Sequence, residues 1–130
     1  MIVLDTSVAI EVLAQSETGR AAEQFFVTGG TLHAPHLLDA EFAHVLRRQA
    51  RFGMISASKA MDLIDKLRSL RLTRYAHLPL LSRVWSLREN MTAYDALFIA
   101  LTEQLDATLL TRDAAFKSVR LRAGRVELLS

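Results

Sequence analysis

The chain has 130 residues, a formal net charge of +2, 51% hydrophobic and 23% charged residues, and no Cys. This balance predicts one globular domain, residues 1–130, and excludes disulfides and thiolate chemistry. No apolar stretch approaches the ~20 residues that span a bilayer, and Asp5 interrupts the N-terminal apolar run before a secretory signal can form, so we expect a cytoplasmic protein without a membrane anchor.

Strand and helix signals alternate along the first half of the chain. The expected elements are a strand over 2–4, a helix that follows to about 13, a helix capped at 16 or 18, a strand over 31–34 and a helix over 36–52. The second of these helices carries Ala22, Phe25 and Phe26 on one face. The glycine pair Gly29-Gly30 is expected to end it.

The same alternation continues in the second half. The expected elements are a helix from 56, a strand over 71–75, a helix from 79 to 85, a helix over 92–105, a strand over 108–111, a short helix over 113–119 and a strand over 126–129. The helix from 56 has an apolar stripe of Ala57, Ala60, Met61, Ile64 and Leu67. Strands alternating with helices predict right-handed βαβ crossovers, and so a three-layer α/β/α sandwich around a mostly parallel sheet.

Four acidic residues, Asp5, Glu41, Asp95 and Asp113, follow short apolar runs or begin expected helices. In a parallel sheet such positions converge outside the carboxyl ends of the strands. Two ionised carboxylates ~5 Å apart repel by ~3 kcal/mol at an effective dielectric of ~20. A cluster of these acids therefore predicts a bound cation, and oxygen-only ligands favour Mg²⁺ or Mn²⁺.

Three of the acids also have a structural explanation. Asp5 and Asp113 can each be the N-cap of the helix that follows. Thr92 and Asp95 match a capping box, in which Asp95 bonds back to the Thr92 backbone. Taken singly, each of these acids fits the capping interpretation.

Glu41 does not fit it, because it lies beyond the first turn of its helix. It falls within the apolar stripe formed by Leu38, Phe42, Val45 and Leu46. An acid directed towards a core is rare unless it is paired or coordinates a metal. Asp39, two residues away, is expected to face elsewhere.

Basic residues offer two candidate phosphate-binding regions. Arg47, Arg48 and Arg51 follow Glu41 on one helix, although cations near a helix C-terminus also complement its dipole. The second region lies near Asp113 and comprises Arg112, Lys117, Arg120, Arg122 and Arg125. The four His residues are expected to be solvated or core residues, and no Gly-rich phosphate loop is present. A phosphotransfer receiver domain is disfavoured, because no Asp follows the strand over 71–75.

The segments IVLDTS from Ile2, LLDAEF from Leu37, YDA from Tyr94 and LTRD from Leu110 resemble the PIN-domain nucleases. More narrowly, they resemble the VapC toxins of bacterial type II toxin–antitoxin modules. The resemblance implies a PIN-like fold and a Mg²⁺- or Mn²⁺-dependent endoribonuclease that leaves 5′-phosphate and 3′-hydroxyl ends. It also implies an RNA substrate, an antitoxin partner and a homodimer.

By the same resemblance, Asp5, Glu41, Asp95 and Asp113 are the catalytic, metal-binding residues, and Thr6 and Thr111 orient their carboxylates. Arg47, Arg48, Arg51 and Arg112 are the candidate RNA contacts. Many family members have a further acid shortly after the fourth, where this chain has Ala114-Ala115-Phe116. One or two bound ions therefore both remain open, and so does the alternative of a catalytically silent PIN-like binding module.

Overall fold

A computed structural model describes residues 1–28 and 30–130. Five strands form one sheet in the order β3-β2-β1-β4-β5, and each neighbouring pair is parallel. The strands are β1 (Ile2–Leu4), β2 (Leu32–Pro35), β3 (Leu72–Tyr75), β4 (Thr108–Thr111) and β5 (Arg125–Leu128). The predicted parallel sheet is confirmed.

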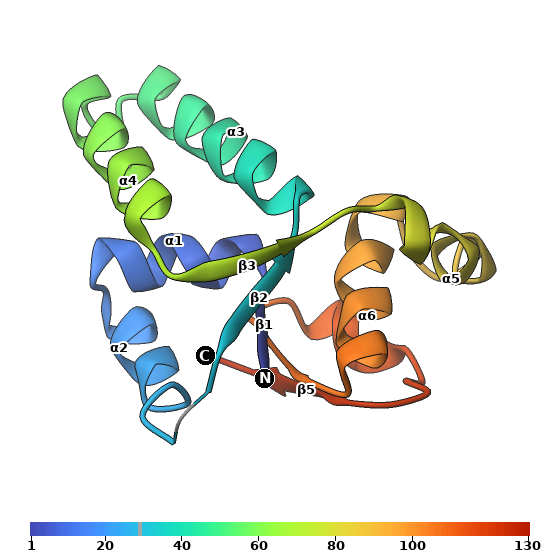
Figure 1. Ribbon diagram of the computed structural model, residues 1–130. Helices are drawn as coiled ribbons and strands as arrows, with labels where there is room; N and C mark the ends of the chain where they lie inside the picture. The colour runs from blue at the N-terminus through green and yellow to red at the C-terminus, as the bar shows by residue number, and fades with distance from the viewer. Residues whose placement is uncertain (29) are drawn as a thin grey trace.

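Helices cover both faces of this sheet, and Figure 1 shows α1 to α4 on one side and α5 and α6 on the other. They are α1 (Thr6–Ala14), α2 (Glu17–Glu23), α3 (Leu37–Arg51), α4 (Ala57–Ser69), α5 (Leu81–Ser86) and α6 (Ala93–Leu105), with 3₁₀ turns η1 (Leu78–Leu80) and η2 (Ala114–Ser118). The three-layer α/β/α sandwich is therefore confirmed. Among the described residues, no helix is long and apolar enough to cross a membrane.

The core lies between the central strands and the helices that cover them. Val3 and Leu4 of β1 and Leu109 and Leu110 of β4 are inaccessible to solvent. Helix α6 is buried without a break from Ala96 to Thr102, as its continuous apolar run predicts. This rigid centre fixes the strand ends from which the acidic residues project.

Two details of the helices differ from the predictions. Helix α2 ends at Glu23, and the chain continues in i→i+3 turns, with Phe25 N–H bonded to Ala22 C=O, so Phe25 and Phe26 lie beyond the helix. The predicted stop at Gly29-Gly30 includes Gly29, which lies outside the described residues. Two members of the predicted apolar stripe of α4 are exposed: Ala57 at its first position, and Met61, whose exposed fraction is 47%.

The corner between α1 and α2 gives the first prediction. Gly19 lies so close to α1 that a Cβ there would collide with the Glu11 carbonyl and with Val12 Cα. We expect Gly19→Ala to lower the free energy of unfolding by about 1–3 kcal/mol, measured by urea denaturation. In an uncrowded helix the same change stabilises by about 0.5–1 kcal/mol. A stabilised variant would therefore contradict this packing.

Candidate metal centre

The strand order reverses beside β1, because the chain proceeds from β1 to β2 and β3 on one side and returns to β4 on the other. In open parallel sheets, ligands bind outside the carboxyl ends of the strands at such a reversal. Asp5 directly follows β1, and its N–H bonds to the Leu110 carbonyl of β4 at 3.0 Å. The topology thus places Asp5 at the expected ligand-binding position.

The Asp5 carboxylate is held by three hydrogen bonds. Oδ1 accepts from the Thr6 N–H at 2.8 Å, so the predicted N-cap of α1 is present. Oδ2 accepts from the Thr111 hydroxyl at 2.7 Å and from the Ser7 hydroxyl at 3.4 Å. Capping therefore occupies one oxygen, while Thr111 fixes the orientation of the other.

The electrostatic environment of Asp5 is unfavourable to its charge. Burial raises the pKa of Asp5 to about 6, against the lowering effect of the bonds from Thr111 and Thr6. The negative charges of Asp95 and Glu41 raise that pKa further. Near pH 7 the group is ionised, partly buried and close to other acids, an arrangement that a cation would relieve.

Glu41 and Asp95 approach the same region from two helices. Glu41, in the second turn of α3, is half-buried, and its Oε1 accepts from the Thr6 hydroxyl at 2.7 Å. Burial raises the pKa of Glu41, and so does the charge of Asp95, while His44 lowers it. Burial also raises the pKa of Asp95, helped by the charge of Asp113. Both acids therefore belong to one electrostatically coupled group with Asp5.

The fourth acid, Asp113, is exposed and caps η2, because its Oδ1 accepts from the Ala115 N–H at 2.9 Å. Its own N–H donates to the Thr111 hydroxyl at 3.0 Å. Thr111 therefore bridges the acids that follow β1 and β4. Asp95 makes only half of its predicted capping box, in which its N–H donates to the Thr92 hydroxyl at 3.2 Å.

The carboxylates influence one another, but they do not form a finished ligand cage. In the part of the chain that the structure describes, no three acidic or His side chains are placed closely enough to hold one ion. None of the four acids forms an ion pair with Lys or Arg within the same residues. Their donor chemistry nevertheless fits a hard divalent cation, because the ligands are all oxygen and the buried charge of Asp5 lacks a cationic partner.

The arginine predictions separate into two groups. Arg47, Arg48 and Arg51 are exposed and, with His44, line a shallow depression of about 380 Å³ on the C-terminal half of α3. At a rise of 1.5 Å per residue, they lie about 9–15 Å along the helix axis from Glu41. The structure therefore does not bring these three side chains to the acids.

Arg112 lies nearer, directly after β4, and pairs with Glu11 of α1 at 3.0 Å. Two polar contacts were missed at the sequence level. Ser7 bonds Asp5, and its place in the first turn after an N-cap Asp is a usable local signal. His77 accepts from the Leu37 N–H at 2.9 Å across 40 residues, for which the sequence offers no local signal.

The bridging role of Thr111 leads to a second prediction. Because its hydrogen bond lowers the pKa of Asp5, we expect Thr111→Val to raise that pKa above about 6. We expect the free energy of unfolding to fall by about 1–3 kcal/mol, since a buried charged acceptor loses its donor. Carboxyl NMR titration and urea denaturation measure the two effects. Thr102→Val, which removes a buried hydroxyl bonded to Phe98 within α6, is the matched control and should leave the pKa of Asp5 unchanged.

Comparison with known proteins agrees with this fold. The family model described as the PIN domain matches residues 2–121. The chain therefore belongs to the PIN-domain family, as the resemblance of its motifs indicates. Within that family it is similar to ribonuclease VapC9 of Mycobacterium tuberculosis, at 38% identity over 87% of this chain and 86% of the relative. Ribonuclease VapC1 of the same species is 39% identical over 86% of this chain and 85% of the relative.

Solved structures confirm the architecture. The crystal structure of VapBC2 from Rickettsia felis, bound to a DNA fragment from its promoter, superposes with a TM-score of 0.74 over 100% of both chains. The structure of PAE2754 from Pyrobaculum aerophilum gives a TM-score of 0.71 over 96% of this chain and 82% of that chain. Identities of 16% and 20% limit these likenesses to the fold.

Proposed function

We propose that the chain is a divalent-metal-dependent endoribonuclease and the toxin of a type II toxin–antitoxin pair. The observation that carries the proposal is the partly buried Asp5 carboxylate at the strand-order reversal, close to the charges of Glu41 and Asp95. The names of its relatives VapC9 and VapC1 support ribonuclease as the activity. The acids, the fold position and the relatives therefore favour the same chemistry.

In this proposal Asp5, Glu41, Asp95 and Asp113 hold Mg²⁺ or Mn²⁺. When bound, such an ion supplies a water of lowered pKa and stabilises charge on phosphoryl oxygens. Thr111 and Thr6 orient the carboxylates of Asp5 and Glu41 through the hydrogen bonds at 2.7 Å. The partly buried setting strengthens every electrostatic interaction made there.

Both one and two bound ions are compatible with the acids present. Where many family members have a further acid, this chain has Ala114 and Ala115, followed by Phe116, whose side chain is buried in the core. Four carboxylates can hold one ion or bridge two, and the stoichiometry of a calorimetric titration distinguishes one ion from two. The arrangement of acids thus does not itself require a second ion.

The proposed partners are an RNA substrate, a cognate antitoxin and a second copy of the chain, all in the cytoplasm. The neighbouring structure from Rickettsia felis is a VapBC complex, which supports the antitoxin. Co-purification with the product of an adjacent small reading frame tests this partner. Sedimentation of the isolated chain tests the homodimer.

The basic face of α3 leads to a third prediction, made with Asp95→Asn protein so that RNA is bound without being cleaved. We expect replacement of Arg47, Arg48 and Arg51 by Ala to reduce the slope of log K against log salt by about 2, because each phosphate contact contributes ~0.7 for single strands. Fluorescence anisotropy with single-stranded RNA measures the slope. An unchanged slope would show that these side chains serve only the helix terminus.

The deciding experiment is cleavage of total RNA by purified protein with Mg²⁺ or Mn²⁺, beside Asp95→Asn protein and a chelator control. We expect cleavage that requires the metal and is lost in the variant, with 5′-phosphate ends on the fragments. Equal cleavage by Asp95→Asn would identify a contaminating nuclease. A folded protein that binds no Mg²⁺ or Mn²⁺ in calorimetry would instead support the catalytically silent binding module.

A further inference from the structure

The first turn of α3 is hydrogen-bonded to the edge strand β3 and to the segment that follows β3. The His36 N–H donates to the Tyr75 carbonyl at 2.9 Å, which extends the β2–β3 ladder into the helix start. The next N–H, of Leu37, donates to His77 Nε2 at 2.9 Å. The start of α3 is thus held from outside its own helix.

This external support replaces an ordinary N-cap. The first four N–H groups of a helix have no partner within the helix and need other acceptors. His36 occupies the N-cap position of α3, but its side chain makes no capping hydrogen bond. His77 supplies an acceptor in its place, 40 residues further along the chain.

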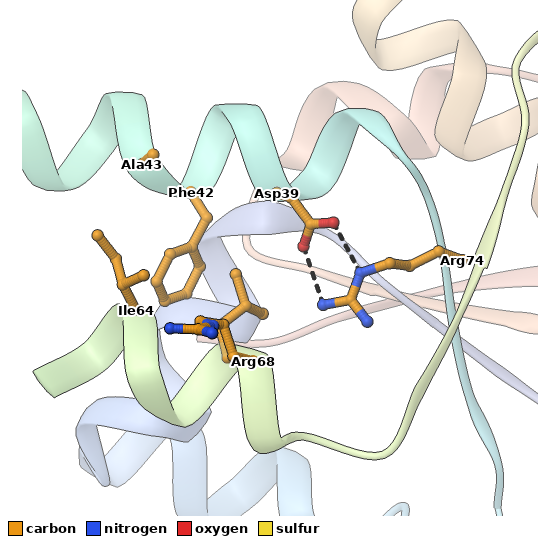
Figure 2. Close-up of a pocket in the computed structure, with 7 residues that line it drawn as sticks. Asp39, Phe42, Ala43, Ile64, Arg68 and Arg74 are labelled. Carbon is orange, nitrogen blue, oxygen red and sulfur yellow. Dashed lines mark hydrogen bonds and ion pairs between the residues drawn. The ribbon is translucent and has the colours of Figure 1, made fainter. Parts of the chain in front are cut away.

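A third link joins the same turn to β3. The Arg74 guanidinium donates two parallel hydrogen bonds to the Asp39 carboxylate, as Figure 2 shows. Their lengths are 2.7 Å from Nε and 3.0 Å from Nη2. The side chains are 25% and 40% exposed, so the pair adds little to stability. A two-point bond between planar groups instead fixes geometry. Arg74 therefore sets how this turn is rotated and placed.

Glu41 follows on the next turn, four residues after Leu37, so its backbone position depends on the first turn. Its carboxylate is also bonded to the Thr6 hydroxyl at 2.7 Å, which leaves little room for displacement. A shift of the helix start would carry the Glu41 carboxylate away from Thr6 and from Asp5. The contacts made by β3 and His77 therefore act on Glu41 through the backbone of α3.

We infer that His77 and Arg74 are positioning residues that hold Glu41 in place for the metal ion. This inference rests on the proposed metal-dependent function. Neither side chain is one of the four proposed ligands. They act by holding the first turn of α3. Loss of a hydrogen-bonding partner that orients a metal ligand typically lowers metal affinity about 10–100-fold.

Calorimetric titration of purified protein with Mn²⁺ tests the inference without any measurement of activity. We expect His77→Ala and Arg74→Ala each to weaken Mn²⁺ binding about tenfold or more. His77→Gln, whose amide oxygen can accept from Leu37 N–H, should restore affinity to within about threefold of the wild type. The matched control is Arg68→Ala, because Arg68 lines the same groove as Arg74 but its ion pair is with Asp65 of its own helix. It should leave affinity unchanged.

A double-mutant cycle with Glu41→Ala separates positioning from general destabilisation. In the Glu41→Ala background, we expect His77→Ala to cause no further loss of Mn²⁺ affinity, because the side chain it positions is gone. Hydrogen exchange provides a second measurement on metal-free protein, in which the Leu37 amide should exchange faster in His77→Ala than in His77→Gln. A variant that fails to fold in either background is replaced by Arg74→Ala in the same cycle.

The outcomes distinguish the two proposals. Wild-type protein that binds no Mn²⁺ would overturn the proposed function and this inference with it. Wild-type binding that Glu41→Ala weakens, but that His77→Ala and Arg74→Ala leave unchanged, would overturn the positioning role alone. Equal losses caused by His77→Ala with and without Glu41 would also overturn it, since the effect would then not pass through Glu41.

Discussion

We expect Asp5→Asn to lower the rate of RNA cleavage by at least ~10²-fold. We expect the same change to stabilise the metal-free protein near neutral pH. Asn keeps the N-cap of α1, because it is as good a capping residue as Asp. It removes a carboxylate whose burial raises the pKa to about 6 from an ordinary value of 3.8. At about 1.4 kcal/mol per pKa unit, the gain in free energy of unfolding is at most about 3 kcal/mol.

The sign follows from proton linkage. Because the folded protein holds the Asp5 proton more tightly than the unfolded chain, ionisation of this group reduces stability as pH rises from about 4 to about 6, and no further above that. The raised pKa values of Glu41 and Asp95 act in the same direction. Burial alone would raise the pKa of Glu103, but its hydrogen bonds with Arg83 lower it below the ordinary value. Ionisation of Glu103 therefore increases stability as pH rises.

The informative quantity is therefore the difference between wild type and Asp5→Asn, measured by urea denaturation across that pH range with a chelator present. We expect the difference to be near zero at pH ~4 and to grow in favour of the variant up to pH ~6. Asp62→Asn, at an exposed position of α4, should show no such trend. A variant less stable than wild type at pH ~7 would show that the Asp5 charge is well accommodated without a cation.

The second large effect concerns the metal ion itself. At a Mn²⁺ concentration 100 times Kd, binding to the folded state alone adds about 2.7 kcal/mol to the free energy of unfolding near pH 7. At pH ~5 most of a carboxyl group with a pKa of about 6 is protonated, which weakens apparent affinity about tenfold. The same Mn²⁺ concentration should then add only about 1.4 kcal/mol.

Thermal and urea denaturation with and without Mn²⁺ at the two pH values measure this effect. Asp95→Asn should lose most of the stabilisation at both. Asp62→Asn again serves as the control, and it should respond to Mn²⁺ as the wild type does. Stabilisation that is equal at the two pH values would show that the ion binds elsewhere than at the coupled carboxylates.

The parts of the site with local signals were predictable from the sequence. A short apolar strand followed at once by Asp5-Thr6 predicts a buried strand end and a helix cap, and the structure contains both. Glu41 within an apolar stripe predicts an acid turned inward, and the residue is half-buried against Thr6. In each case neighbours within one or two turns determine the environment.

Contacts between distant segments were not predictable in this way. No periodicity indicates that His77 accepts from Leu37 or that Arg74 grips Asp39. The hydrogen bonds of Thr6 and Thr111 to acidic side chains were expected only through the resemblance to a family, and both are present. The early end of α2 and the exposure of Met61 likewise depend on how the helices pack. The residues of α2 and α4 alone do not indicate that packing.

The central claim is that a divalent cation binds among the acids at the strand-order reversal. Anomalous scattering from crystals soaked in Mn²⁺ tests it most directly. We expect a peak within coordination distance of the Asp5 and Asp95 carboxylates, about 2 Å, which disappears in Asp95→Asn crystals. Well-ordered crystals with these carboxylates visible and no peak between them would contradict the account.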